Sequence, residues 1–439
     1  MRSALLALAA ALAAAPLGAQ TPSPTPDPSP APGTPVESGP VQPADPPSPA
    51  PPEKKPVSAS AGGDGFAIQS EGGDYKLQFR AYTHADARFY PGDDTELGID
   101  QFLLRRVRPI LQGTLAKHFE FNVTPDFGGG TTVIQDAFLD VRYSPRARVR
   151  IGKFKVPLGL ERLQSATVMT FVERAFPSSL VSVREVGAQV SGDLAGGVFT
   201  YALGVFEGAL DGASADLDTN DAKDLEGRVF VSPFKKGESA LRDLGFGIAG
   251  SIGDQTGALP AYRSGGQLPI ASYVVGAIAD GRRTRLVPQL SFYAGPFGLM
   301  AEYAQSDAFV RSASGQRTEV GVRAWQTTAT WTLTGEPASF SGIRPRNPFD
   351  PGQGHWGAFE LGARVNAFEI DDEAFTAGLF DPARSVREAF AWGLVVQWHL
   401  NRHVKEVVSY ERTTFTAGAA DGADRPAENA LFIRTQLSF

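Results

Sequence analysis

The chain has 439 residues, a formal net charge of −7 and no cysteine. Its mean hydropathy of −0.14 excludes a bundle of transmembrane helices, and its acidic balance gives no overall argument for nucleic-acid binding. The absence of cysteine is consistent with an exported chain that avoids stray disulfides.

The N-terminus carries the features of a secretory signal peptide over residues 1–19. Met1 and Arg2 form a short basic start, Leu5 to Ala15 is an apolar run, and small residues lead up to Ala19. The run is too short to span a bilayer, and no apolar run after Val186 reaches the ~20 residues of a membrane helix. An exported chain of this kind is either soluble or a β-barrel.

Residues 20–63 are predicted to form a disordered periplasmic tether. Proline recurs densely between Thr21 and Pro56, which favours an extended polyproline-II-like chain of ~3.1 Å per residue. Two readings stay open: a plain spacer, and a tether that runs towards the cell wall.

Residues 64–439 are predicted to form a transmembrane β-barrel. From Tyr75 to Phe89 apolar and polar residues alternate for fifteen positions. That exceeds the ~5–6 residues of an ordinary strand and suits the ~9–11 residues of a tilted membrane strand. The pattern predicts about sixteen strands, near 75–89, 102–115, 119–127, 133–143, 147–156, 186–194, 197–208, 223–234, 242–253, 284–294, 297–309, 319–334, 357–371, 388–400, 403–415 and 429–439.

Short and long connections alternate in the way that outer-membrane barrels require. Short turns are expected to be periplasmic, and long polar loops at 90–101, 209–222, 254–283 and 335–356 are expected to be external. The last strand ends on Phe439, which resembles the signal read by the outer-membrane barrel assembly machinery.

One break in the alternation differs from a polar loop. Between Arg150 and Glu185 the pattern stops for about thirty residues, which carry Arg162, Arg174 and Arg184. Because sixteen strands enclose a lumen too wide for side chains to fill, we expect this segment to fold inward as a constriction.

The strand near 102–115 carries a cluster of arginines. By parity Arg106 and Arg108 share a face with Gln112 and Thr114, which assigns them to the lumen. Arg105 is then on the opposite face, unless the strand is irregular there.

Three other motifs are weak. A GxGxxG match at 245–250 lies inside an alternating strand, which argues against a dinucleotide site. Asp216, Asp218 and Asn220 lack the glycine and glutamate of an EF-hand, and His399 and His403 straddle a turn rather than share a helix face. We therefore expect no cofactor, no metal and no catalytic cluster.

Several stretches resemble the phosphate-selective porin O/P family over residues 64–439. They are GKFKVPLGLERLQSATVMTFVER, VGAQVSGDL, YALGVFEG, FLLRRVRPILQGTL, IQDAFLDVRY, LTGE, HLNRHVKEVVSYERTTF and LFIRTQLSF. The resemblance implies a sixteen-stranded antiparallel barrel that assembles as a homotrimer. It also implies a location in the Gram-negative outer membrane, in contact with its lipid, and a lumen lined by arginine and lysine that passes phosphate-like anions.

The resemblance also implies individual pore residues. Arg80 matches a lumen arginine, Arg105 and Arg106 match a constriction pair, Asp136 matches a carboxylate facing the basic cluster, and Arg162 falls where the family carries a constriction lysine. A further family lysine is absent here, because residues 165–168 read Ser-Ala-Thr-Val.

We therefore predict a passive channel for small anions, phosphate or related oxyanions, and not an enzyme. The alternative is a general, weakly selective porin of the same fold. A third possibility, a barrel enzyme or surface adhesin, would need a catalytic cluster or a folded external domain, and neither is visible.

Overall fold

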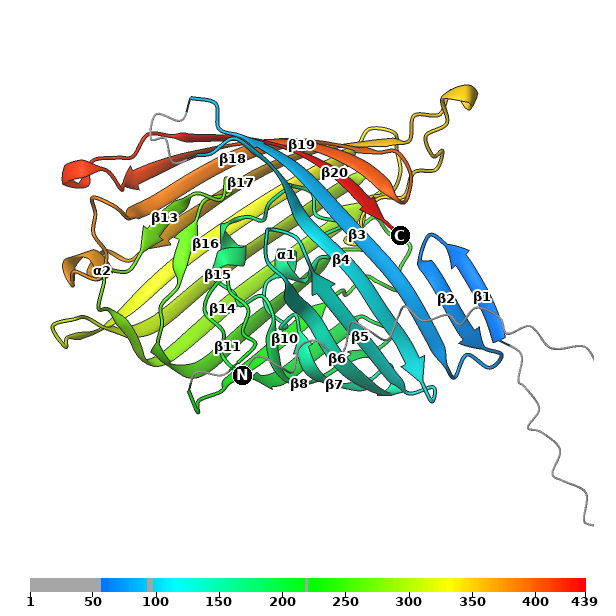
Figure 1. Ribbon diagram of the computed structural model, residues 1–439, viewed down its shortest axis with the longest axis horizontal. Coiled ribbons are helices and arrows are strands. Elements are labelled where there is room, and N and C mark those ends of the chain that lie inside the picture. The colour runs from blue at the N-terminus through cyan, green and yellow to red at the C-terminus, as the bar shows by residue number, and fades with distance from the viewer. Residues whose placement is uncertain (1–56, 93–97, 218–219) are drawn as a thin grey trace, which may run out of the picture. The chain divides into compact units, whose positions relative to one another are not determined.

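The computed structural model describes residues 57–92, 98–217 and 220–439. The predicted signal peptide and the proline-dense part of the tether lie outside these residues. The described chain is built almost entirely of antiparallel strands (Figure 1).

The main sheet has eighteen strands within these residues, and sixteen of them form a closed barrel once the β1–β2 hairpin is set aside. They pair in sequence order, and the barrel closes where the last strand pairs with the first, from Leu431 opposite Phe89 to Ser438 opposite Tyr82. The barrel strands are β3 (Lys76–Phe89), β4 (Gln101–Leu115), β5 (Phe119–Asp126), β6 (Val133–Ser144), β7 (Ala147–Phe154), β8 (Glu185–Leu194), β9 (Phe199–Phe206), β10 (Asp224–Val231), β11 (Gly245–Gly257), β14 (Ile278–Ala294), β15 (Phe297–Arg311), β16 (Arg317–Thr332), β17 (Ala358–Ile370), β18 (Val386–His399), β19 (Val404–Ala417) and β20 (Glu428–Ser438).

The predicted sixteen-stranded antiparallel barrel is thus confirmed. The remaining elements are small: the hairpin strands β1 (Val57–Gly62) and β2 (Gly65–Ser70), a separate two-stranded sheet of β12 (Ala261–Arg263) and β13 (Pro269–Ser272), the helices α1 (Leu160–Leu163) and α2 (Asp372–Thr376), and the 3-10 turns η1 (Phe176–Ser179), η2 (Pro351–Gln353) and η3 (Ala420–Gly422).

The chain before the barrel is ordered earlier than the sequence suggested. β1 starts at Val57. β2 pairs antiparallel with the first residues of β3, with Phe66 opposite Phe79. The predicted tether boundary at residue 63 therefore moves to a position before Val57. The hairpin forms because β3 extends beyond the end of β20 and leaves backbone groups there to be paired.

Inward and outward side chains alternate along each strand. On β3, His84 and Asp86 are buried inside the barrel, whereas Leu77 and Phe79 are exposed on the outer face. Exposed apolar side chains on the outside and buried polar ones inside are the arrangement of a barrel that faces lipid.

The two ends of the barrel follow from the connections. The C-terminus, the two-residue connection 295–296 and the turn 400–403 lie at one end, which is the periplasmic end of an outer-membrane barrel. The prediction that 335–356 is an external loop is wrong, because this segment lies at that same end. Its Ala338 N–H donates to Gly295 O at 2.8 Å, and Phe349 N–H donates to Leu400 O at 2.6 Å. The reason is topological: twelve barrel strands precede the segment, so the chain has returned to its starting end.

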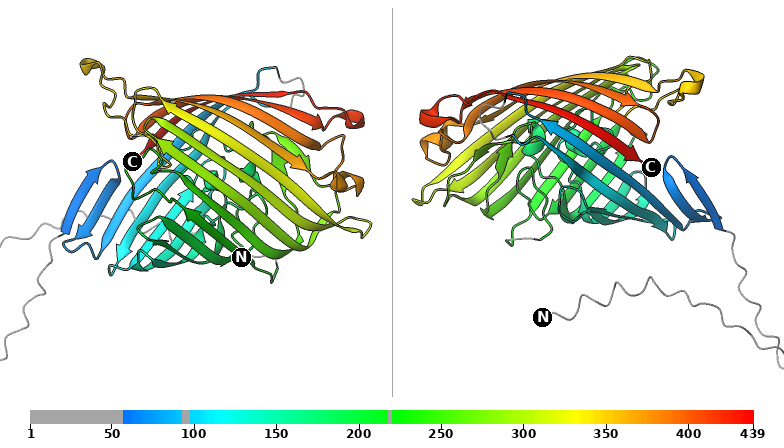
Figure 2. Two further views of the ribbon diagram at one scale, coloured as in Figure 1. Left: turned by 180° about the vertical axis from the view of Figure 1, so that it is seen from behind. Right: turned by 45° about the horizontal axis from the view of Figure 1, so that its top comes forward.

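The barrel wall differs in height around its circumference, because the strands differ in length. β5, β7, β9 and β10 have eight residues each, whereas β14, β15 and β16 have 17, 15 and 16. Figure 2 shows the long strands on the taller side, coloured from green to orange. Among the residues that the structure describes, no helix is long and apolar enough to cross a bilayer.

Candidate functional site

The segment 155–184, between β7 and β8, packs against the inner face of the barrel. The backbone N–H groups of Leu160 and Glu161 donate to the Glu302 carboxylate on β15, at 2.6 and 3.2 Å. Phe176 N–H donates to Asn366 Oδ1 on β17 at 3.3 Å. Figure 1 draws α1 of this segment among the strands of the barrel.

A glycine allows the chain to turn into this segment. Gly159 has φ of 66°, a left-handed conformation that favours glycine, and a Cβ there would lie 2.9 Å from the Val181 side chain. Beyond it Leu180 and Val181 are fully buried in a cluster that includes Phe368 and Ile370 of β17. The apolar residues of 155–184 are therefore the core that fills this side of the lumen.

Carboxylates of the segment bind arginines of the wall. Glu173 accepts from Arg88 Nη2 at 2.8 Å and from Arg105 Nε at 2.7 Å, and Glu161 lies 3.6 Å from Arg364. These groups are almost all buried, so loss of one partner would leave an uncompensated charge in the lumen.

A cavity of about 550 Å³ remains between the segment and the wall formed by β3 to β7. The structure brings all five sequence-predicted pore residues to its lining: Arg80, Arg105, Arg106, Asp136 and Arg162.

Arg105 reaches the cavity because β4 is irregular at that position. His84 pairs with Arg106 and Ala85 pairs with Leu104, so Arg105 is an extra residue in the strand. A β-bulge of this kind redirects a side chain and lets two successive arginines face the same side. Strict alternation had placed Arg105 on the opposite face.

The cavity is lined by nine basic side chains, and four of them are neutralised by carboxylates. The neutralised pairs are Arg105–Glu173, Arg108–Asp126, Arg150–Asp140 and Arg184–Asp136. No ion pair joins the other five to a carboxylate within the described residues. These five, called here the unpaired cations, are Arg80, Arg106, Lys155, Arg162 and Arg174.

The partner of Asp136 is Arg184. The two side chains form a bidentate pair, with Nε to Oδ1 at 3.0 Å and Nη2 to Oδ2 at 3.1 Å. The carboxylate therefore meets the basic cluster, as the family resemblance implies, but it compensates an arginine outside the predicted set.

Three of the unpaired cations are held by backbone carbonyls of the segment itself. Lys155 Nζ donates to Gln164 O at 2.6 Å, Arg174 Nη2 donates to the same oxygen at 3.1 Å, and Arg162 donates to Ser178 O. Carbonyl oxygens fix the positions of these groups without cancelling their charge.

Burial, and then the positive neighbours Arg174 and Arg184, place the pKa of Lys155 well below its usual range. The pKa of Arg162 is also lowered, by burial and by Arg174. Burial opposes ionisation of Glu173, but Arg105 and Arg106 outweigh it and hold the pKa of this carboxyl well below its usual range. The cluster is thus a crowded positive environment that stabilises negative charge.

Two further cavities adjoin this one. An upper cavity of about 350 Å³ shares Arg105, Arg106, Arg162 and Arg174 with it, and also includes Leu259 to Ala261 of the β11–β14 connection. A lower cavity of about 220 Å³ shares Arg80, Tyr82 and Ser165 with it, and includes Phe439 at the periplasmic end. Because neighbouring cavities share lining residues, the three cavities form a continuous series, and arginines lie at both junctions between them.

The β11–β14 connection also turns inward, although the sequence suggested a plain external loop at 254–283. Tyr262 and Ile270, on β12 and β13, are buried in the same cluster as Phe176 and Phe368. Tyr262 lies 5.1 Å from Phe368, ring to ring. The apolar residues Tyr262, Leu268 and Ile270, which lie close together in a segment expected to be polar, are the sequence feature that indicates this inward turn.

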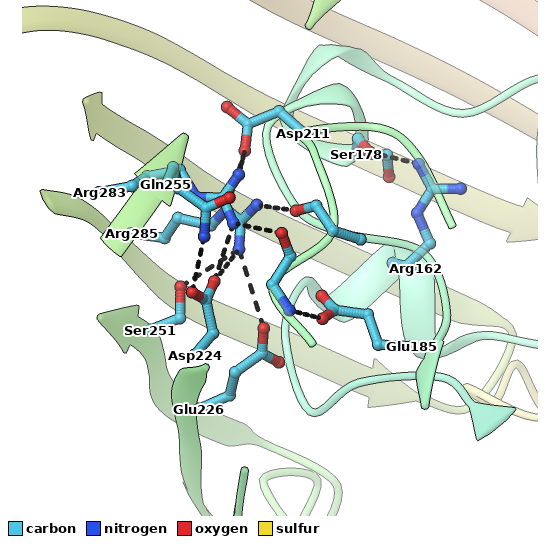
Figure 3. A network of polar contacts seen from close by, with 12 residues as sticks. Arg162, Ser178, Glu185, Asp211, Asp224, Glu226, Ser251, Gln255, Arg283 and Arg285 are labelled. Atoms are coloured by element: carbon cyan, nitrogen blue, oxygen red, sulfur yellow. Dashed lines mark hydrogen bonds and ion pairs between the residues drawn. The ribbon is translucent and has the colours of Figure 1, made fainter. Parts of the chain in front are cut away.

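The β9–β10 connection is held by a buried ion-pair network (Figure 3). Arg285 Nε donates to Asp211 at 2.8 Å, Arg285 Nη2 donates to Ala209 O at 2.7 Å, and Arg283 Nη2 donates to Asp224 at 2.8 Å. Asp211 also lines the upper cavity, so this network fixes the position of part of that cavity's lining. Within the described residues no group of three or more metal-ligating side chains could hold a metal ion.

A closed barrel with an apolar outer surface and a charged inner surface is the architecture of an outer-membrane channel. The model of the family described as phosphate-selective porin O and P matches residues 76–439. The chain belongs to this family.

Solved porin structures share the fold at low sequence identity. OmpT of Vibrio cholerae, in its trimer form, aligns with a TM-score of 0.53 and 12% identity over 83% of this chain and 99% of that one. The outer-membrane channel DcaP of Acinetobacter baumannii gives 0.56 and 11% over 84% and 99%. An anion-selective porin from Comamonas acidovorans gives 0.52 and 10% over 83% and 100%. A comparison with curated protein sequences found no match.

Proposed function

We propose that this channel conducts small anions passively, and that the central cavity between segment 155–184 and the wall of β3 to β7 is its constriction. The observation that carries the proposal is the set of five unpaired cations around one cavity of about 550 Å³. In a low-dielectric passage, uncompensated positive charge attracts anions and repels cations.

Phosphate or a related oxyanion is the proposed substrate class. A guanidinium group presents a planar fork of donors that bonds oxyanion oxygens bidentately. Arg106 at the upper junction and Arg80 at the lower junction, which no carboxylate of the described residues neutralises, supply such forks in series. A series of moderate sites lets an ion enter without being held, as conduction requires.

A second candidate is a general porin with weak selectivity. It is favoured by the uncharged residues that line part of the cavity, Ser165 and Ala166, where the family resemblance implies a lysine nearby.

Reversal potentials in planar bilayers separate the two. An anion channel gives a chloride-over-potassium permeability ratio well above one, and added phosphate reduces its chloride current. A ratio near one, with no phosphate effect, would support the general porin and contradict the proposed constriction.

We also propose a homotrimer. Four strands on one side of the barrel, β5, β7, β9 and β10, have eight residues, fewer than the ~9–11 that a lipid-facing membrane strand needs. Contact with other subunits would cover this low wall. The structurally similar OmpT is itself described in a trimer form.

The signal peptide, export to the outer membrane and recognition of Phe439 by the barrel assembly machinery remain part of this proposal. Phe439 packs 5.9 Å from Phe66 and 6.1 Å from Phe79, ring to ring, and its backbone pairs with Ala81. A chain lacking Phe439 should accumulate outside the membrane fraction.

A further inference from the structure

Arg106 is held by a side chain of the barrel wall, unlike the three unpaired cations that backbone carbonyls of the segment hold. Its Nη1 lies 3.2 Å from Nδ1 of His84, which is fully buried on β3. The two residues are opposite each other on neighbouring strands, beside the irregularity that admits Arg105. A guanidinium group has only donors, so Nδ1 of this imidazole is the acceptor. His84 is therefore neutral and carries its proton on Nε2.

A neutral acceptor leaves the charge of Arg106 intact. A carboxylate in the place of His84 would neutralise this arginine, whereas the imidazole binds one of its N–H donors and adds no charge. Within the described residues the Arg106 side chain makes no further hydrogen bond, and it lines both the central and the upper cavity. The remaining donors are therefore available to an anion that passes between the two cavities.

Gln436 lies on the other side of the imidazole, opposite His84 on β20. Its Oε1 and the Nε2 of His84 are both buried and have no hydrogen-bond partner in the described part of the chain. An Nε2–H donor and an amide oxygen on paired positions are complementary. Gln436 Nε2 donates in turn to Thr167 O of segment 155–184, at 3.1 Å. Gln436 and His84 thus lie in series between the segment and Arg106.

The charges around Arg106 make such an acceptor necessary. Arg105, Arg174 and Arg434 act on it with like charge. Glu173 attracts it, but this carboxylate already accepts from Arg105. Without an acceptor on β3, repulsion by its neighbours would move the guanidinium group away from the junction between the two cavities.

We propose that His84 is a positioning residue of the channel. It holds the guanidinium group of Arg106 at the junction between the central and upper cavities, and Gln436 orients the imidazole for this contact. The inference rests on the proposed anion conduction, in which Arg106 is one of the groups that meet the ion. His84 lines neither of these two cavities, so it acts on the anion only through Arg106.

The first test separates the position of Arg106 from its charge. His84→Leu removes the acceptor, so the phosphate concentration that halves the chloride current should rise about fivefold, the order expected for one hydrogen bond. The anion-over-cation ratio should fall less than in Arg106→Ala, because the charge is retained. His84→Asn, whose Oδ1 replaces Nδ1 as the acceptor, should restore phosphate block. The control is His118→Leu, at the exposed turn after β4, which should leave the block unchanged.

A double variant shows whether His84 acts through Arg106. His84→Leu combined with Arg106→Ala should behave as Arg106→Ala alone, because the acceptor then has no donor to hold. Heat-modifiable migration on gels shows that each variant is folded. A further loss of phosphate block in the double variant, or an unchanged block in His84→Leu, would overturn the proposal.

Solid-state NMR spectroscopy of isotope-labelled histidine gives a readout that does not depend on conduction. At about pH 7 the His84 signals, assigned by their loss in His84→Leu, should show a proton on Nε2 and none on Nδ1. Arg106→Ala should shift the Nδ1 signal. A proton on Nδ1 would overturn the proposal. If the tautomer is as expected and the unmodified channel lacks anion selectivity, the proposed function fails, while the contact between His84 and Arg106 stands.

Discussion

Glu173 Oε1 lies 2.7 Å from Arg105 Nε, across the gap between segment 155–184 and the bulge in β4. The same oxygen accepts from Arg88 at 2.8 Å. One buried carboxylate thus fixes the position of the segment against β3 and β4. It also neutralises Arg88 and Arg105, which are therefore not unpaired cations. Position and charge of the proposed constriction are set by the same contact.

Glu173→Gln is expected to destabilise the barrel by about 3 kcal/mol, because it leaves the buried guanidinium of Arg88 and the partly buried one of Arg105 without their carboxylate. Urea unfolding of the refolded protein in detergent measures this loss. The control is Glu120→Gln, which breaks a pair with Arg142 whose side chain is 52% exposed, and which should cost less than about 1 kcal/mol. Equal losses in both variants would show that Glu173 does not anchor the segment.

Arg106→Ala is expected to lower the anion-over-cation permeability ratio by about fivefold. A unit charge about 8 Å from the ion path, at an effective dielectric constant of about 40, contributes about 1 kcal/mol. Reversal potentials under a potassium chloride gradient measure the ratio. Arg311→Ala is the control, because Arg311 is half-exposed at the external end of β15 and pairs with Asp280. A ratio unchanged by Arg106→Ala would remove this residue from the selectivity site.

Anion selectivity is expected to fall as pH rises towards about 10, at values below the ordinary lysine pKa of ~10.4. The pKa of Lys155 is lowered by burial and by neighbouring arginines, so this cation loses its proton at a lower pH than a free lysine. Reversal potentials across that range test the effect. Lys155→Met should be less sensitive to pH than the unmodified protein, and Lys155→Arg should stay selective to a higher pH. The same pH dependence in Lys155→Met would assign the titration to another group.

Ser165→Lys is expected to lower the phosphate concentration that halves the chloride current by about fivefold. Ser165 lines both the central and the lower cavity, so the new ammonium would add a charge where these two cavities meet. Ser314→Lys, in the short external connection after β15, adds the same charge far from the lumen. If both variants respond equally, the effect is a general surface potential and not a site.

The segment 335–356 is expected to be accessible from the periplasm. The chain has no cysteine, so Gln353→Cys and Ser314→Cys each provide a single labelling site. A membrane-impermeant maleimide applied to intact cells should label Cys at 314 and should label Cys at 353 only after the outer membrane is opened. Labelling of the 353 variant in intact cells would contradict the topology.

The strand pattern was readable from the sequence because the physical rule is local. A membrane strand needs outward apolar and inward polar residues at alternate positions, so period-two runs such as Leu77 to Phe89 specify both the strands and the faces of their side chains. The same rule placed Arg80 and Arg106 in the lumen. It failed at Arg105, because a bulge depends on the pairing partner and not on the strand's own residues.

The positions of the connections between strands could be predicted from the sequence only in part. The inward fold expected for 155–184 rests on its lack of alternation, whereas the alternation predicted neither the inward β12–β13 sheet nor the periplasmic position of 335–356. Whether a connection folds into the lumen depends on the inner surface it meets, such as Phe368 under Tyr262, and that surface comes from distant strands.

The sequence by itself thus determined the class of the protein, the sixteen strands, and the inward side of Arg80 and Arg106, because each of these depends on residues a few positions apart. Only the tertiary structure decided which cations keep their charge uncompensated. That choice depends on carboxylates brought from far along the chain: Glu173 to Arg105 across 68 positions, and Asp136 to Arg184 across 48. The proposed electrostatic selectivity depends on charges summed in space, so it requires the barrel to be closed around the segment.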